Sequence, residues 1–233
     1  WTDKLGLLVW QDMPAGEHRT ATARAQWELE MQRHIENHFN SPSIILWVLF
    51  NEGWGEYDSE RLVDLMRSAD PTRLISDASG WYDKKWGDIV DKHFYPGPGA
   101  PWLEEKRASV TGEFGGLGYI TVGHMWDAHA WGYQSFTNIE QLTEEYQRLW
   151  QRAYDLKDDR GLSAAVYTQI SDIEQEANGL QTYDRLEKMD RNKVRAADLG
   201  ELPPLKYREI VPMSQVTPQS WRFTPTKPPA GWN

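Results

Sequence analysis

The sequence predicts an α/β fold of the (β/α)8 barrel type that is incomplete. Short apolar runs alternate with amphipathic stretches of helical period, as in proteins whose parallel strands are joined by crossover helices. The 233 residues can bury one substantial core, and barrels of this type take about 250 residues. Six strands can be counted rather than eight, so a barrel would lack its first two strands. An open sheet of six parallel strands is the alternative, and the strand count alone favours it.

The predicted strands are short apolar runs that end at polar or turn-forming residues. The run at 44–50 is almost wholly apolar, as expected of a strand that is covered on both faces. In chain order, the six predicted strands cover residues 7–11, 44–50, 74–77, 89–94, 109–112 and 164–170.

The chain is interpreted as a βαβα order throughout, with four predicted helices of which the last follows the final strand. In the first helix, Trp27, Met31, Ile35 and Phe39 lie four residues apart and therefore on one face. Residues 137–140, Thr-Asn-Ile-Glu, have the form of a capping box and should begin the third helix. The predicted helices cover residues 21–39, 59–69, 137–153 and 189–199.

Two regions are predicted along the chain. Residues 1–200 should form the partial barrel, and residues 201–233 should form an extended connector that leads toward a further domain. Proline favours such a connector because its ring fixes φ and it cannot continue a helix. The prolines of this region are Pro203, Pro204, Pro212, Pro218, Pro225, Pro228 and Pro229.

The composition argues against several classes of function. The net charge of −10 and the pI near 5.1 disfavour nucleic acid as a partner, because its phosphates are held by clustered Lys and Arg. Without cysteine the chain has no disulfide, no thiolate nucleophile and no cysteine-ligated metal. The apolar runs are far shorter than the roughly 20 residues that cross a bilayer, so we expect a soluble protein with no membrane partner. The compartment stays open, and a full-length parent could be secreted or periplasmic.

A glutamate directly follows the most apolar predicted strand. Glu52 comes after Asn51 at the end of the run 44–50, which places its carboxylate at the carboxyl end of a strand. Enzymes with a barrel fold gather their catalytic groups at this end. A glutamate that caps a helix or lies in a loop is the alternative.

A second predicted strand also ends in a glutamate. Glu113 follows Gly112 and precedes a further glycine pair, Gly115 and Gly116, which lets backbone or ligand approach closely. Because the strand ends of one barrel share a mouth, we expect the carboxyl groups of Glu52 and Glu113 to face each other about 5 Å apart. This is the separation at which retaining glycosidases hold their two carboxylates.

Several segments closely resemble motifs of the family 2 glycoside hydrolases. The order of these motifs is that of the family from Trp1 to about Leu199. The segments are FNEGWG (50–55) for the acid/base motif, GEFGG (112–116) for the nucleophile motif, LGLLVWQD (5–12) for the third strand, and VYTQ (166–169) with NGLQTYDR (178–185) for the eighth strand and its loop.

The resemblance implies a retaining, galactosidase-like β-glycosidase that acts on a carbohydrate substrate without cofactor or metal. Glu52 would be the general acid/base and Glu113 the nucleophile. Asn51 would bond the sugar 2-hydroxyl, with a turn former as its alternative. Tyr95, in the segment HFYP (93–96), would bond the nucleophile, with simple packing as its alternative.

Other residues are implied in substrate binding. Asp12, at the end of the strand that resembles the family's third, would touch substrate or the acid/base, and a structural role is equally open. The aromatic and amide side chains expected to line the sugar pocket are Trp54, Trp131, Tyr167 and Gln169.

Two motifs of related enzymes are missing. The segment EANG (176–179) lacks the asparagine and lysine with which β-glucuronidases bind the sugar carboxylate, which disfavours glucuronides. Phe50 stands where many β-mannosidases have a second asparagine before the Asn-Glu pair. His124, Asp127 and His129 match no metal-ligand spacing, so no metal is expected.

A different class of function stays open. Without the loops after the first two strands, which supply sugar contacts in the family, the chain could be a carbohydrate-binding or catalytically silent fragment. The open side of an incomplete barrel would also be an exposed apolar edge, which predicts self-association.

Overall fold

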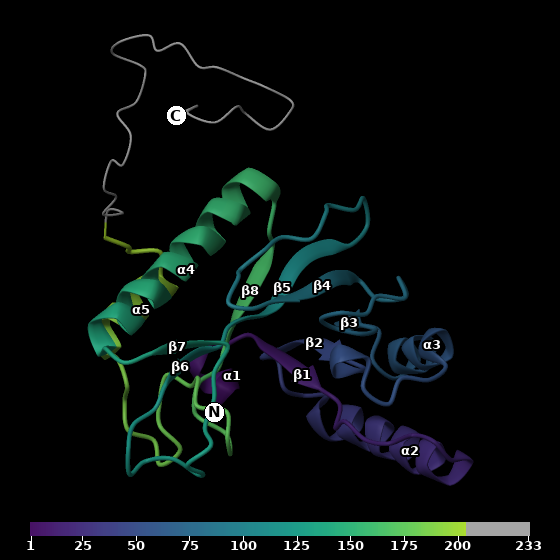
Figure 1. Ribbon diagram of the computed structural model, residues 1–233. Helices are drawn as coiled ribbons and strands as arrows, with labels where there is room; N and C mark the ends of the chain where they lie inside the picture. Colours follow the sequence, from purple (N-terminus) through teal and green to yellow (C-terminus); the bar gives the residue numbers. More distant parts are fainter. Residues whose placement is uncertain (204–233) are drawn as a thin grey trace, which may run out of the picture. The chain divides into compact units, whose positions relative to one another are not determined.

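The six predicted strands are all present in the computed structural model, which describes residues 1–203 (Figure 1). Residues 204–233, nearly all of the predicted connector, lie outside the described residues. The strands are β1 (Val9–Asp12), β2 (Ile44–Val48), β3 (Leu74–Ser76), β4 (Ile89–Phe94), β5 (Ala108–Gly115) and β8 (Ala164–Thr168).

These strands form two parallel sheets of three strands each. Their orders are β1-β2-β3 and β4-β5-β8. The two sheets meet where β3 approaches β4, and there the Asp88 N–H donates a hydrogen bond of 2.7 Å to the Ile75 carbonyl. The carboxyl ends of all six strands therefore point the same way around the fold.

Side chains from both sheets share one buried interior. In an open sheet β1 and β8 would lie at opposite edges, whereas here both contribute to one cluster. The strands thus curve around a common axis, and the open-sheet alternative is wrong. Within residues 1–203 β1 and β8 do not pair, so the barrel is incomplete, as predicted. The cluster consists of Leu46, Val48, Ile89 and Val110, with Trp10, Ile45, Ala108 and Ala164 packed against it.

Helices follow only some of the strands. In the described part of the chain no helix lies between β3 and β4 or between β4 and β5, so the predicted βαβα order is wrong at these two connections. The second connection holds Pro96, Pro98 and Pro101, which remove backbone donors that a helix needs. The helices are α1 (Thr2–Leu5), α2 (Ala21–His38), α3 (Ser59–Ala69), α4 (Ile139–Arg160) and α5 (Arg191–Asp198).

The segment between β5 and α4 departs from the prediction. It contains two short parallel strands, β6 (Leu117–Tyr119) and β7 (Gln134–Phe136), that the sequence did not predict. The predicted capping box at Thr137 is also wrong by one residue. Asn138 is the N-cap, and its side-chain carbonyl accepts from two N–H groups of the first turn at 2.7 and 3.1 Å.

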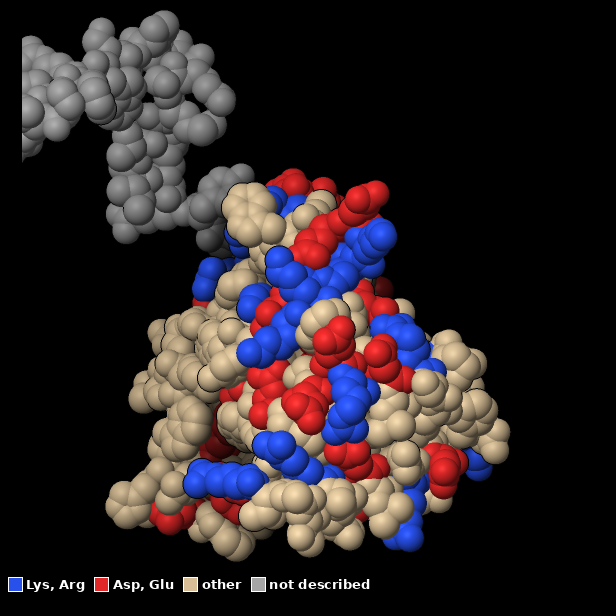
Figure 2. Space-filling model, turned by 90° about the vertical axis from the view of Figure 1, so that its right-hand side faces the viewer, with Lys and Arg blue, Asp and Glu red and all other residues tan. Residues whose placement is uncertain are grey.

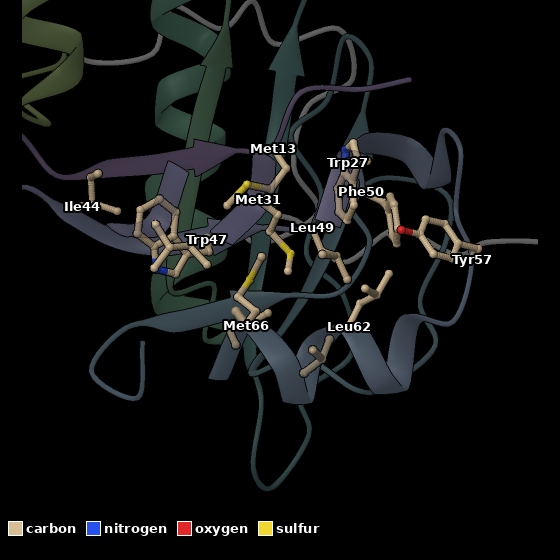
Figure 3. Close-up of a cluster of buried hydrophobic side chains, with 13 residues drawn as sticks. Met13, Trp27, Met31, Ile44, Trp47, Leu49, Phe50, Tyr57, Leu62 and Met66 are labelled. Atoms are coloured by element: carbon tan, nitrogen blue, oxygen red, sulfur yellow. The ribbon is translucent and has the colours of Figure 1, made fainter. Parts of the chain in front are cut away.

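Helices α2 and α3 cover the sheet β1-β2-β3, and a hydrophobic cluster fills the space between them (Figure 3). The predicted apolar face of α2 is confirmed for Trp27, Met31 and Ile35, which are all buried. Phe39 is 43% exposed because the helix ends one residue before it. This cluster holds the outer face of β2 and so fixes the strand that leads to Glu52.

The surface carries charges of both signs. On the face shown in Figure 2, acidic and basic side chains are interspersed. Arg61 pairs with Glu28 and Arg67 with Asp88. Among residues 1–203 no helix has both the length and the apolar character that a membrane span requires.

Candidate active site

Glu52 lies in a tight loop directly after β2. The chain turns there through a single 3-10 turn, η1 (Asn51–Gly53), and Glu52 has the left-handed backbone angles φ 50 and ψ 23. This conformation is costly for a residue with a side chain and needs support. Ser79, which is buried, supplies it: its hydroxyl accepts from the Glu52 N–H at 3.1 Å and donates to Asn51 Oδ1 at 2.7 Å.

Glu113 lies inside β5 rather than after it, because the strand continues to Gly115. The register with β4 shifts beside it: Lys92 is opposite Thr111 and His93 is opposite Glu113, so Gly112 is an extra, bulged residue. A bulge reverses the alternation of side chains along a strand. Val110 before the bulge and Glu113 after it can therefore both face the barrel interior.

The glycine at the bulge is required by its neighbour. The Gly112 N–H donates to the buried Asp91 carboxylate at 2.6 Å, and a Cβ at Gly112 would lie 2.2 Å from the other Asp91 oxygen. A larger residue fits there only if the buried Asp91 side chain shifts.

The structure brings the two predicted glutamates together. One carboxylate oxygen of Glu52, one of Glu113 and a ring nitrogen of His93 all lie within 4.8 Å of one another. His93 Nδ1 lies 2.9 Å from Glu52 Oε1 and 3.4 Å from Glu113 Oε2. Because both neighbours are acceptors when ionised, Nδ1 must carry the proton that it shares with them.

Each glutamate also accepts a hydrogen bond from a side chain that does not contact the other glutamate. The indole N–H of Trp81 donates to Glu52 Oε1 at 3.0 Å, and the Tyr95 hydroxyl donates to Glu113 Oε2. The expected contact between Tyr95 and Glu113 is therefore present. The side chains of Glu52 and Glu113 are 17% and 29% exposed, so both carboxylates remain accessible from the mouth of the barrel.

Two carboxyl groups at this mouth, those of Glu113 and Asp12, have raised pKa values. Burial raises the pKa of Glu113, and the charges of Glu52 and Glu176 raise it further, whereas His93 and Tyr95 oppose the shift. Desolvation by the surrounding walls, followed by the charge of Glu113, raises the pKa of Asp12 to about 6. Asp12, although solvent-exposed at the end of β1, thus lies within reach of the nucleophile's field.

The other residues predicted to line the sugar pocket differ in their exposure and contacts. Trp54 is 57% exposed and Trp131 is 44% exposed, with the Trp131 ring packed edge-on against Tyr133. Gln169 reaches the site indirectly, since it donates to Asn178 at 2.8 Å. The ring of Tyr167, which was also predicted to line the pocket, packs edge-on against Phe114 and Tyr146 in the cluster beneath α4.

Sequence reasoning missed five residues of the site. His93 could have been found, because it alternates with Asp91 and Tyr95 and so shares the inward face of β4. Tyr133 stacks flat on Tyr95, with ring centroids 3.8 Å apart and an interplanar angle of 4°. No spacing in the sequence predicts this stack or the loop contacts. The missed residues are Ser79, Trp81, His93, Tyr133 and Glu176.

The ligand atoms of Glu52, His93 and Glu113 are also spaced so that they could hold a metal ion. In the described structure the same atoms are engaged with Trp81, Tyr95 and each other. His124 and His129 pair with different carboxylates, those of Asp184 and Asp127.

A family comparison agrees with this fold and site. The model of the TIM barrel domain of glycosyl hydrolases family 2 matches residues 4–188 of the chain. The chain therefore belongs to glycoside hydrolase family 2, as the motifs predicted. A comparison with curated proteins gave no match.

Solved structures of that family have the same fold. β-Glucuronidase 2 of Bacteroides uniformis, bound covalently to cyclophellitol-6-carboxylate aziridine, is 19% identical with a TM-score of 0.60, over 80% of this chain and 27% of that one. The β-galacturonidase of Eisenbergiella tayi, bound to galacturonate, is 18% identical with a TM-score of 0.62, over 85% of this chain and 42% of that one. The chain thus spans well under half the length of these relatives.

Proposed function

We propose that the chain carries the catalytic site of a retaining β-glycosidase. The observation that supports this most is the pair of carboxylates, Glu52 and Glu113, whose facing oxygens lie within 4.8 Å. Retaining enzymes hold their two carboxyl groups about 5 Å apart, whereas inverting enzymes leave a wider gap for a water molecule. The distance therefore favours double displacement through a glycosyl–enzyme intermediate.

In this proposal Glu113 is the nucleophile. Its Oε2 accepts from Tyr95 and faces His93, so Oε1 is the oxygen available to attack the anomeric carbon. The Tyr95 donor stabilises the ionised carboxylate, which is the form that attacks.

Glu52 is then the general acid/base. Its Oε1 already accepts from Trp81 and His93, so the transferable proton belongs on Oε2. Glu52 first gives this proton to the leaving oxygen and later takes one from the attacking water. Asn51, whose Oδ1 is occupied by Ser79, has its amide N–H groups free to donate to the sugar 2-hydroxyl.

The substrate in this proposal is a galactosidase-like β-glycoside, and the reaction uses no cofactor. Exposed rings around the mouth, including Trp54, Trp81 and Trp131, offer flat surfaces on which sugar C–H faces stack. A carbohydrate-binding or silent fragment remains the second candidate, because the barrel is open and the chain spans only 27–42% of the relatives described above.

An assay with aryl β-glycosides separates these candidates. It should be run on the chain itself and on the full-length protein that contains it. Hydrolysis with retention of the anomeric configuration, lost on Glu113→Gln, supports the enzyme. Binding of sugars without turnover in either form would support the second candidate.

A further inference from the structure

The loop between β3 and β4, residues 77–88, supplies two of the hydrogen bonds that hold Glu52. The Ser79 hydroxyl accepts from the Glu52 N–H at 3.1 Å, and the Trp81 indole N–H donates to Glu52 Oε1 at 3.0 Å. One bond fixes the backbone of Glu52 and the other fixes its carboxylate. A group that holds this loop in place therefore also holds the acid/base.

The large side chains of the loop do not anchor it by burial. Trp81 is 58% exposed and Tyr82 is 48% exposed. At the base of the loop, the buried Asp77 carboxylate accepts from the Lys84 N–H at 3.2 Å and from the Trp86 N–H at 3.1 Å. These bonds draw the two ends of the loop together, and a second group ties its outer part to the barrel.

Arg107 is this second group. It lies directly before β5, it is buried, and its guanidinium donates five hydrogen bonds. Two form a fork to the Asp83 carboxylate of the loop, at 2.7 and 3.0 Å, and two go to Glu104, at 2.8 and 2.7 Å. The fifth goes to the Ile89 carbonyl at the start of β4, at 3.3 Å. Because a guanidinium has five N–H donors, all of them are used.

The place of Arg107 in the chain connects the supports of the two glutamates. β5 carries Glu113, so the loop that holds Glu52 is attached to the strand of the nucleophile. A forked contact between guanidinium and carboxylate fixes direction as well as distance, which the single ammonium of a lysine does not reproduce. Because Asp83 lies two residues after Trp81, loss of the fork should displace the Trp81 donor and with it the Glu52 carboxylate.

We propose that Arg107 is a positioning residue for the general acid/base. Through Asp83 it holds the loop that orients Glu52 for proton donation to the leaving group. The five hydrogen bonds of Arg107 go to groups other than the two glutamates, so it acts through the loop. This inference rests on the proposed function, since it concerns the same site.

The test uses two substrates that differ in their need for acid catalysis. They are the 2,4-dinitrophenyl and the phenyl β-glycoside of the sugar that the full-length protein hydrolyses fastest. The dinitrophenolate leaves almost without protonation, whereas the phenolate needs a proton. Arg107→Lys keeps the charge and loses the fork. Because a misplaced general acid loses much of its effect, kcat/KM should fall roughly tenfold or more for the phenyl glycoside and less than about threefold for the other.

Arg73→Lys is the matched control. The side chain of Arg73 is 9% exposed, against 7% for Arg107, and it pairs with the buried Asp70 at 2.6 Å. It lies directly before β3 and donates to the Ile44 carbonyl at the start of β2, at 2.8 Å. Both variants should unfold at lower denaturant concentration, but in Arg73→Lys the two substrates should be affected equally.

Asp83→Asn alters the other partner of the fork and decides the test if Arg107→Lys does not fold. It should show the same selective loss on the phenyl glycoside. An equal loss on both substrates in a folded Arg107 or Asp83 variant, or a selective loss of the same size in Arg73→Lys, overturns the role of Arg107. Absence of turnover of every aryl β-glycoside by the wild type overturns the proposed function itself, so the two failures are distinguishable.

Discussion

The two glutamates of the site are held by different kinds of structure. Glu113 lies inside β5, where backbone pairing with β4 and a bulge against Asp91 fix its position. Glu52 lies outside any strand, in a left-handed turn that one serine hydroxyl, that of Ser79, clamps. Its carboxylate then depends on further side chains, Trp81 and His93.

This difference assigns different sensitivities to the two residues. A residue inside a strand is held by the backbone hydrogen bonds of the sheet. A substitution that disrupts these bonds therefore lowers the free energy of unfolding. The loop of Glu52 is held by a few side-chain contacts. Removing one of these contacts should disturb the geometry of the active site while most of the core stays intact. We therefore expect that substitutions which disturb the support of Glu113 lower the stability of the fold. Substitutions which disturb the support of Glu52 should mainly lower activity.

The largest expected effect separates the chemical roles. Glu113→Gln should lower kcat by roughly 10⁴-fold or more and abolish the covalent intermediate, because an amide does not attack the anomeric carbon at a useful rate. Glu52→Ala should retain glycosylation by substrates with activated phenol leaving groups, which need little protonation. Rapid-quench measurement of the released phenol and mass spectrometry of the protein check both.

The second step distinguishes the roles further. In Glu52→Ala the intermediate should accumulate for want of a base, and added azide should release it as a β-glycosyl azide. An α-glycosyl azide, or rescue that is independent of leaving-group acidity, would show that the two roles are exchanged or wrong.

A substitution at the bulge beside Glu113 tests whether this feature holds the nucleophile in place. Gly112→Ala would place a Cβ 2.2 Å from a carboxylate oxygen of Asp91, which is buried and would have to shift. We expect a loss of about 3 kcal/mol in the free energy of unfolding, typical of overpacking with a lost hydrogen bond, together with lower activity. Denaturant unfolding measures it.

A double-mutant cycle provides the control for this substitution. Asp91→Ala makes room at the bulge, so the double variant should be less destabilised than the sum of the single variants. Additive losses would mean that the Asp91 contact does not set the bulge.

The same difference between Glu113 and Glu52 explains which parts of the site the sequence could predict. Apolar runs predicted all six barrel strands, and strand ends predicted Glu52 and Glu113, because these signals are local. The bulge was not predictable: the glycine at 112 looks like a strand end, and only Asp91 across the sheet reveals its purpose.

Tyr167 and Gln169 show a second limit. The resemblance implied both as pocket residues, and two residues apart they would share one face of a continuous strand. β8 ends at Thr168, however, so the alternation stops between them. Tyr167 packs beneath α4, whereas Gln169 turns toward Asn178.

A substitution of Ser79 tests whether its two hydrogen bonds position Glu52. Ser79→Ala removes the acceptor for the Glu52 N–H and the donor to Asn51, and should lower kcat/KM roughly 10- to 100-fold with only a small loss of stability. Ser68→Ala is the matched control, because that exposed hydroxyl bonds only the Asp64 carbonyl of its own helix. Equal activities of the two variants would show that the clamp does not position Glu52.

The smallest expected effect is a shift along the pH axis. The Tyr95 hydroxyl donates to ionised Glu113 and so lowers its pKa, against burial and the neighbouring carboxylates that raise it. Tyr95→Phe removes this stabilisation of the charged form, so the pKa of Glu113 should rise further. Since the nucleophile must be ionised to attack, the acid limb of the kcat/KM profile should move to higher pH, with the largest loss of activity at low pH. Tyr183→Phe, on an exposed loop tyrosine, should leave the profile unchanged. An acid limb that stays in place, or moves to lower pH, would mean that Glu113 is not the group whose ionisation limits the reaction.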